Sequence, residues 1–374
     1  MTVLTAAEDR RPLPVREAAV VTCTPAPAID RVYLLPTVAL GRVNRARVVS
    51  EEVAGKGVNV SRMLAGAAVP TRMVLPWSGE GTLLPPEAVV VPTTQPTRLH
   101  TIVIDAEGVT TNINEFAAAL SDAEWSLLAR RCRAAVEEIR AGWLLIGGSI
   151  PWPEDDAVIA RLLGAATDAG ARVAVDTSGS GLARIARRHG PSIALVKPNT
   201  AELAEATGTA LHTRGDVVDA ARRLIRCGIG AVLASAGADG IVYVDGGSAL
   251  WATGPGVDRV VNTTGAGDAA LAGFLSATAT ADPVGEGLIR AIRWSQAAVR
   301  STHACPPPAE IGDVALRVSP LGRVDRDLPL SDPGDDLDPL PQTAAARRRP
   351  DAAAARSPRL PADHPTANHE GRLT

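Results

Sequence analysis

One stretch of the sequence combines an anion-binding turn with a carboxylate. Val261–Asp268 ends in Gly265-Ala266-Gly267-Asp268 and leads into a predicted helix rich in small residues, Ala269–Thr280. The glycines allow a tight turn whose N–H groups converge, and the helix N-terminus adds the positive end of its dipole. Asp268 would repel a phosphate there unless it acts chemically. A general base that deprotonates an attacking hydroxyl, beside donors that stabilise a transferring phosphoryl group, accounts for both features.

Two other interpretations of this turn remain open. Gly265–Ala270 also matches the G-x-G-x-x-A pattern of dinucleotide-binding folds, which needs an opening βαβ unit and an acidic residue after the next strand. In the second interpretation the stretch is simply the start of a helix, and Asp268 interacts favourably with the positive end of the helix dipole. Other parts of the chain must decide between these interpretations.

A second glycine turn, Ala54–Asn59, opens another predicted helix. Its glycines allow close backbone approach, Lys56 can bind an anion and Asn59 can hydrogen-bond a hydroxyl. The turn is not a P-loop, because it has neither the spacing of that motif nor the hydroxyl residue after the lysine. Earlier in the chain, Asp30 lies just beyond the predicted strand Ala18–Cys23, where ligands bind in open sheets. A turn or cap aspartate is the alternative.

The use of lysine is selective. Only Lys56 and Lys197 among the 38 basic residues are lysines, and both lie in motif-like stretches. A compact ammonium acts as a point charge on phosphate, unlike the planar guanidinium of arginine. Lys197 is followed by Asn199 and Glu202, which either form a helix capping box or support the water shell of a magnesium ion. The later glycine turn Ala234–Gly240 suits a nucleotide that lies against the backbone.

The order of the predicted elements indicates an α/β fold. After the buried strand Leu144–Ile146, helices and strands alternate, which predicts a mostly parallel sheet covered by helices on both faces. The predicted strand Arg42–Val53 and the hairpin Leu99–Asp105/Val109–Ile113 predict a small β-sheet lid, with strands within about 31–53 and 97–113. The alternating elements are Asp155–Ala169, Arg172–Val175, Gly181–Arg188, Ser192–Val196, Thr200–Thr207, Asp216–Arg226 and Ala231–Ser235.

Composition narrows the class of protein. The 374 residues are 46% hydrophobic, which is enough for a sizeable core, and the net charge of −3 gives no general electrostatic case for nucleic acid or an anionic membrane. Four scattered cysteines form no C-x-x-C pair and are expected to be small buried hydrophobes in a reducing compartment. With no signal-like start and no apolar run long enough to span a bilayer, we expect a cytoplasmic protein.

Taken in order, these pieces resemble the PfkB group of ribokinase-like sugar kinases, especially its phosphofructokinase and tagatose-phosphate kinase branch. The resemblance covers about residues 18–318. Asn262–Asp268 matches N-T-x-G-A-G-D, and Ala54–Asn59 is close to G-G-K-G-x-N. Val196–Leu203 resembles K-P-N-x-x-E-L, and Pro27–Asp30 resembles part of N-P-A-x-D. The resemblance implies a ribokinase-like fold with a β lid, with ATP and Mg²⁺ as cofactors.

The resemblance also implies roles for individual residues. Asp268 is the expected catalytic base, and Gly265, Ala266 and Gly267 form the expected anion hole. A dianionic phosphate on the acceptor needs more than a helix end, so Lys56 and Arg98 are expected to hold it, with Arg45 in support. The alternative is that Arg45 and Arg98 are solvated charges of the lid. The expected acceptor-binding residues are Asp30, Arg45, Gly55, Lys56, Asn59, Arg98 and Ser149. The expected nucleotide-binding residues are Lys197, Asn199, Ser235, Gly237, Gly240 and Thr263, with Asn199 and Glu202 supporting Mg²⁺ through water.

The predicted reaction transfers the ATP γ-phosphoryl group to a hydroxyl of a phosphorylated ketohexose: fructose 1-phosphate, fructose 6-phosphate or tagatose 6-phosphate. The alternatives are a kinase for an unphosphorylated sugar or nucleoside, and a catalytically weak sugar-phosphate or nucleotide sensor. At a few positions the sequence differs from the family pattern. These differences bear on which sugar is bound and how fast it is converted, more than on the class of reaction. The differing residues are Ala26, Ala54, Phe116, Trp152 after Ile150-Pro151, and His303.

Domain limits follow from the same patterns. Residues 1–17 are expected to be a flexible arm and residues 18–318 the kinase domain. Residues 319–374 are rich in proline, alanine and charge, so they are expected to form a disordered tail. The resemblance further suggests a homodimer in which two lids clasp each other, with Arg45 reaching the partner's site.

Overall fold

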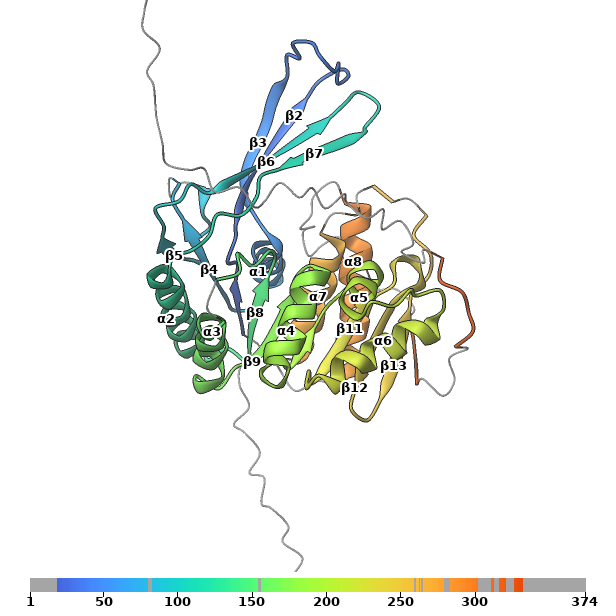
Figure 1. The fold of residues 1–374 in the computed structure, drawn as a ribbon. Helices are drawn as coiled ribbons and strands as arrows, with labels where there is room; N and C mark the ends of the chain where they lie inside the picture. Colours follow the sequence, from blue (N-terminus) through green and yellow to red (C-terminus); the bar gives the residue numbers. More distant parts are fainter. Residues whose placement is uncertain are drawn as a thin grey trace, which may run out of the picture. The chain divides into compact units, whose positions relative to one another are not determined.

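Two β-sheets and the helices α1–α8 make up the described part of the chain (Figure 1). The computed structural model describes residues 19–79, 83–153, 156–258, 260–261, 263, 265–278, 283–301, 311–312, 316–320 and 326–331. The helices are α1 Lys56–Gly66, α2 Asp122–Ile139, α3 Ala157–Asp168, α4 Gly179–His189, α5 Thr200–Thr207, α6 Arg214–Arg226, α7 Ala266–Thr278 and α8 Val284–Arg300.

The central sheet is mostly parallel, as predicted. Its ten strands follow the order β14-β13-β12-β11-β10-β9-β8-β1-β4-β5. All pairs from β11 to β5 are parallel, and the pairs from β11 to β14 are antiparallel. The strands are β1 Val20–Cys23, β4 Thr71–Trp77, β5 Ala88–Pro92, β8 Trp143–Gly147, β9 Arg172–Asp176, β10 Leu195–Val196, β11 Ala231–Ser235, β12 Ile241–Asp245, β13 Ala249–Thr253 and β14 Arg317–Pro320.

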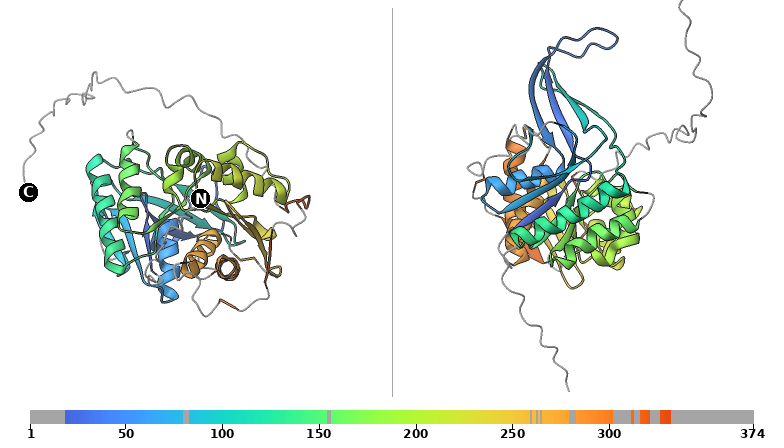
Figure 2. Two further views of the ribbon diagram at one scale, coloured as in Figure 1. Left: turned by 90° about the horizontal axis from the view of Figure 1, so that it is seen from below. Right: turned by 90° about the vertical axis from the view of Figure 1, so that its left-hand side faces the viewer.

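Helices cover both faces of this sheet because successive strand residues point to opposite faces. Val21 and Leu144 pack with α2–α6, whereas Val20 and Leu145 pack with α1, α7 and α8. Figure 2 shows the two helical layers on either side of the sheet. The parallel strands therefore all direct their carboxyl ends to one edge, which is where an open α/β sheet binds ligands.

The predicted lid is a separate four-stranded sheet with the order β3-β2-β6-β7, in which the predicted hairpin is β6–β7. Its strands are β2 Ala28–Leu34, β3 Arg47–Ala54, β6 Arg98–Ile104 and β7 Thr110–Asn114. One boundary of the prediction is wrong. β3 begins at Arg47 and not at Arg42, so Arg45 lies in the preceding exposed loop. Asp30 lies within β2, so the turn or cap alternative does not apply. The connection after β1 is only a few residues long, which leaves no room for a longer turn before the lid begins.

The described chain continues beyond residue 318, the predicted end of the kinase domain. β14 extends to Pro320, and the segment 326–331 packs on the rest of the fold. Leu330 is buried, and its N–H donates to the carbonyl of His212 at 2.8 Å. A segment of six residues is too short to show apolar periodicity. The segment 326–331 was therefore assigned to the tail from the composition of its surroundings. The predicted arm 1–17 and residues 332–374 lie outside the described residues.

Cys23 and Cys132 are buried as expected, but Cys227 is exposed at the end of α6. Cys305 lies outside the described residues. None of the helices in the described ranges is long and apolar enough to cross a lipid bilayer.

Candidate active site

The site lies where the N-termini of α1 and α7 meet the carboxyl ends of the central strands. Glycines make this approach possible. A Cβ on Gly147, at the end of β8, would lie 2.7 Å from the backbone nitrogen of Gly57, and a Cβ on Gly57 would collide with Thr24 after β1. The first turn of α1 therefore rests directly on the strand ends. This contact fixes Lys56 and Asn59 at the ligand-binding edge.

Asp268 and Asn59 are brought together from distant parts of the sequence. Asp268 is buried in the first turn of α7, and the side-chain amide of Asn59 donates to its Oδ2 at 2.8 Å. The anion turn lies above the second lysine of the chain, since a Cβ on Gly267 would be 3.0 Å from Lys197 Nζ. The two glycine turns and Lys197 thus lie together at one edge of the sheet.

Asp176 links both lysines of the chain, and the sequence analysis missed it. Its Oδ1 lies 2.7 Å from Lys56 Nζ, and its Oδ2 lies 3.3 Å from Lys197 Nζ. The Asp176 side chain is fully buried and that of Lys197 is 5% exposed. A signal was present, because Asp176 directly follows a predicted strand. The strand-end argument applied to Asp30 would also have identified it.

Asn199 and Glu202 form a capping box at the start of α5, so the capping alternative is confirmed. Asn199 Oδ1 accepts from the Glu202 N–H at 2.7 Å, and Glu202 Oε2 accepts from the Asn199 N–H at 3.0 Å. Glu202 Oε1 pairs with Lys56 Nζ at 3.1 Å. Within the described ranges, no cluster of three or more His, Cys, Asp or Glu side chains could hold a metal ion.

The cluster carries more negative than positive charge, and this controls Asp268. The carboxylates of Asp176, Glu202 and Asp268 surround the ammonium groups of Lys56 and Lys197. Burial, and then repulsion by Asp176, raise the pKa of Asp268 to about 6, although Asn59 and both lysines oppose this shift. Burial lowers the pKa of Lys56, but Asp176 and Glu202 outweigh it and raise that pKa above its usual value.

The predicted nucleotide-binding segments lie next to each other. The N–H of Ser235 donates to the carbonyl of Pro198 at 3.0 Å, and Ser235 forms a parallel bridge with Asn199. After Ser235, the turn Gly237–Asp239 leads through Gly240 into β12. Thr263 is exposed, and its carbonyl accepts from the N–H of Ala266 at 3.3 Å. Asn262 and Thr264, in the same motif, lie outside the described residues.

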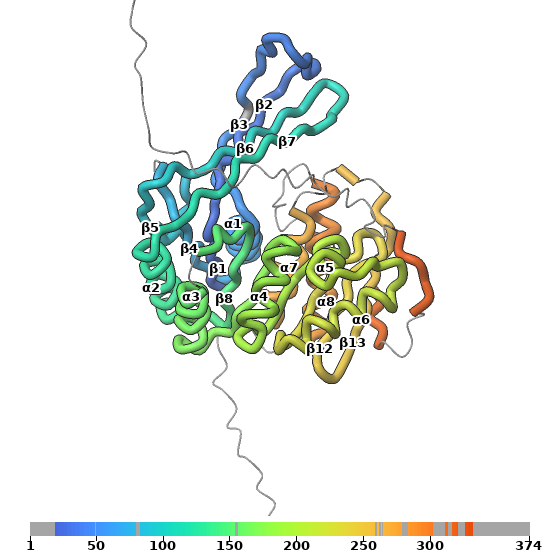
Figure 3. The backbone as a smooth tube through the Cα atoms, in the orientation of Figure 1, coloured from blue at the N-terminus to red at the C-terminus, as the bar shows by residue number. Residues whose placement is uncertain are grey.

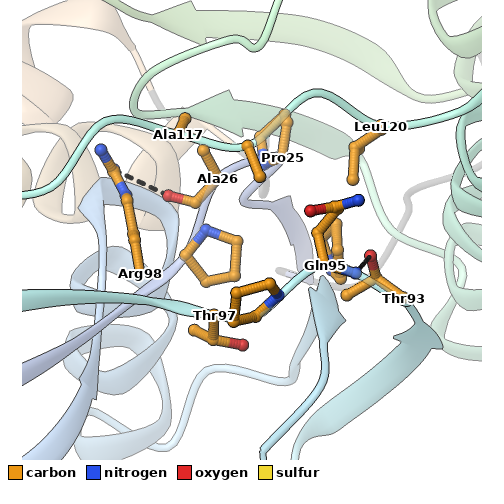
Figure 4. A pocket seen from close by; sticks show the side chains of 12 residues that line it. Pro25, Ala26, Thr93, Gln95, Thr97, Arg98, Ala117 and Leu120 are labelled. Atoms are coloured by element: carbon orange, nitrogen blue, oxygen red, sulfur yellow. Dashed lines mark hydrogen bonds between the residues drawn. The ribbon is translucent and has the colours of Figure 1, made fainter. Parts of the chain in front are cut away.

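A second group of polar residues lies at the base of the lid. Arg98 Nη2 donates to the carbonyl of Ala26 at 2.8 Å, at one side of a pocket (Figure 4). Asp30 Oδ1 lies 3.1 Å from His100 Nδ1, while the buried Nε2 of His100 has no hydrogen-bond partner among the residues that the structure describes. His100 was not identified from the sequence. The pocket is lined by Pro25, Ala26, Pro27, Pro76, Thr93, Gln95, Pro96, Thr97, Arg98, Ala117, Ala118 and Leu120.

The structure places the three expected phosphate-binding residues in different surroundings. Lys56 is engaged by two carboxylates, Arg98 lies at the base of the lid, and Arg45 lies in an exposed loop. Gly55 begins α1 as expected, but Ser149 is exposed beyond β8.

The departures from the family pattern have separate environments. Ala26 contributes its backbone carbonyl to Arg98, and Ala54 is buried at the end of β3. Phe116 is 98% exposed. Arg184 stacks on the Trp152 ring at 4.4 Å, away from the cluster around Asp268. His303 lies outside the described residues.

Asp176→Asn tests the charge cluster. Lys197 would keep its buried positive charge without its counterion, so we expect the free energy of unfolding to fall by about 3 kcal/mol. Chemical denaturation at pH 7 measures the change, with Asp168→Asn, at an exposed residue of α3, as the matched control. An equal, small change in both variants would show that the ion pairs do not stabilise the site.

Comparison with known proteins assigns the family. Residues 84–310 match the model of the pfkB family carbohydrate kinases. The chain is 32% identical to 1-phosphofructokinase from Rhodobacter capsulatus, over 78% of this chain and 94% of that protein. It is 31% identical to ATP-dependent 6-phosphofructokinase isozyme 2 from Escherichia coli, over 66% of this chain and 81% of that protein.

A solved structure agrees. The crystal structure of phosphofructokinase-2 from Escherichia coli in complex with fructose-6-phosphate matches with a TM-score of 0.69 and 26% identity, covering 79% of this chain and 97% of that one. The predicted ribokinase-like fold and family resemblance are therefore confirmed, and the relatives support a phosphofructokinase-type sugar-phosphate kinase. The chain belongs to the pfkB family of carbohydrate kinases, as an ATP-dependent kinase with a hydroxyl acceptor.

Proposed function

We propose that the enzyme transfers the ATP γ-phosphoryl group to a hydroxyl of fructose 1-phosphate, fructose 6-phosphate or tagatose 6-phosphate, with Asp268 as general base. The observation that carries this proposal is the buried Asp268 carboxyl, whose pKa is raised to about 6 beside the anion turn. At pH 7 such a group is mostly ionised, yet it is a stronger base than an ordinary aspartate. The backbone donors of Gly265, Ala266 and Gly267 would stabilise charge on the transferring group.

Lys197 supports a nucleotide phosphate at this turn, because its ammonium lies just beneath Gly267. We assign the nucleotide to the side formed by Ser235, Gly237, Gly240 and Thr263. Both oxygens of Glu202 already have partners, so direct ligation of Mg²⁺ is not favoured. Their remaining lone pairs can accept hydrogen bonds from metal-bound water, which fits Mg²⁺. The bound ion would neutralise charge on the β- and γ-phosphates.

For the acceptor, we propose that Asp30 and Asn59 bind sugar hydroxyls and Arg98 binds the phosphate. The backbone acceptors around Arg98 hold its guanidinium at the pocket (Figure 4). The relatives' names, 1-phosphofructokinase and 6-phosphofructokinase, favour a phosphorylated acceptor over a free sugar or a nucleoside. A sensor without turnover would not need a buried base with a raised pKa.

Asp268→Asn removes the base while keeping its size. We expect kcat to fall by about 10²–10⁴-fold, with nucleotide binding retained. In the unmodified enzyme, kcat/KM should fall as the pH drops through about 6, because Asp268 then becomes protonated. Its raised pKa also means that its ionised form costs stability. Asp268→Asn should therefore melt at a higher temperature at pH 7.5, with the difference vanishing near pH 4. Unchanged kcat would remove Asp268 from the mechanism.

Arg98→Ala tests the acceptor phosphate. A lost charge-assisted contact should raise KM for the sugar phosphate by about ten- to a hundredfold. KM for ATP and KM for the free ketohexose should change little. Arg133→Ala, which breaks an exposed pair with Glu137 on α2, is the matched control. Equal losses on phosphorylated and free sugars would assign the enzyme to unphosphorylated acceptors.

We propose that two lids associate in a homodimer, which would bring Arg45 to the partner's site. In support, the lid and its loops carry exposed apolar side chains. These are Val38, Leu40, Val43, Val48, Val109, Ile113 and Phe116.

Sedimentation tests the dimer. The measured mass of the unmodified protein should be twice the 38.6 kDa of one chain. The variant Ile113→Lys on β7 should be monomeric, because a lysine on an exposed strand opposes its pairing with another strand. Val260→Lys is a control at an exposed apolar residue outside the lid. A monomeric unmodified protein would contradict the proposal.

A further inference from the structure

A six-residue segment beyond the family match holds the nucleotide turn. Residues 326–331 lie after the matched segment, which ends at residue 310. We call them the strap. Ser331 donates from its N–H to Asp239 Oδ2 at 2.7 Å, and its hydroxyl lies 3.0 Å from Asp239 Oδ1. Asp239 belongs to the turn Gly237–Asp239, which we assigned to the nucleotide.

The other end of the strap is anchored on the first turn of α6. Helix N-termini leave N–H groups without intrahelical partners. Here the N–H of Arg214 donates to the carbonyl of Leu328 at 3.1 Å, and that of Gly215 to the carbonyl of Arg326 at 2.9 Å. Arg326 also pairs with Asp219 at 2.7 Å. The strap thus completes the helix cap that Thr213 begins. Figure 3 shows this segment in red beside α6.

The strap closes a ring of contacts around the nucleotide turn. The indole N–H of Trp251, on β13, donates to the carbonyl of Asp239 at 2.8 Å. Arg214, at the start of α6, lies over the Trp251 ring at 4.9 Å. Asp239 is therefore held by its backbone from the sheet and by its side chain from the strap. The strap itself is held at α6.

We infer that the strap is a positioning element for ATP, which preorganises the turn Gly237–Asp239 and thereby sets nucleotide affinity. A loop held in its bound conformation loses less conformational freedom on binding, so its ligand binds more tightly. The strap bonds to this turn, to His212 before α6 and to the start of α6, so it should act on ATP and not on the sugar. This inference rests on the proposed place of the nucleotide.

Two truncations isolate the strap. A chain ended after Ser331 keeps it, and a chain ended after Asp325 removes it. We expect the first to retain the KM for ATP of the full chain, and the second to raise that KM by about three- to tenfold. In both, kcat and the KM for the sugar phosphate should change less than about twofold. An equal rise in the two truncations would assign the effect to residues 332–374 and overturn the inference.

The chain ended after Asp325 could fail to fold, so a point variant in the full chain tests the same contact. Ser331→Pro removes the N–H and the hydroxyl that bind Asp239 but leaves the strap's contacts with α6. It should raise the KM for ATP as the shorter truncation does. Arg326→Ala should mainly lower the melting temperature, since its side chain bonds to Gly215 and Asp219 of α6. An unchanged KM for ATP in Ser331→Pro would overturn the inference.

Binding of a fluorescent ATP analogue separates this inference from the proposed reaction. Its Kd needs no turnover, so it can be measured even if no ketohexose phosphate is converted. Weaker binding after loss of the strap, without any kinase activity, would support the strap and reject the proposed reaction. Equal binding with and without the strap in an active enzyme would reject the strap alone.

Discussion

The ion pairs of Asp176 with Lys56 and Lys197 are the interaction on which the site depends. They join the end of β9 to the first turn of α1 and to the segment that follows β10. A buried ammonium is tolerated only with a counterion, so Asp176 is what allows Lys197 to lie beneath the anion turn. The same carboxylate repels Asp268 and contributes to its raised pKa. One buried aspartate thus places two positive charges and adjusts the base.

Close packing provides the frame for these charges. The N-terminus of α1 can rest on β1 and β8 only because Gly57 and Gly147 have no side chains. α7 brings Asp268 to the same edge from the other end of the sequence, and the hydrogen bond from Asn59 joins the two helices. The site is therefore rigid where phosphate chemistry is proposed. The lid base, with Arg98 and Asp30, is built on a separate sheet.

Much of the fold followed from local pattern. Alternating helices and strands from Leu144 to Ser235 predicted the parallel sheet, and the short turn between Asp105 and Val109 predicted the lid hairpin. Other elements were not predicted, such as α8 and the strands β4 and β13. Their stability comes from packing on both sides of the sheet more than from periodicity. The strap was missed because its bonds join residues about 90 to 120 positions apart.

The sequence by itself determined the chemical types at the site: the anion turn with Asp268, the pairing of lysines with motif-like turns, and the capping box at Asn199. These are encoded in residues close together in the chain, where spacing alone limits geometry. Only the tertiary structure decided which charges meet. It paired Lys56 with Asp176 and Glu202, and it placed His100 opposite Asp30. The physical reason is that electrostatic energy depends on distance and burial, and both are set by how separate strands and helices pack.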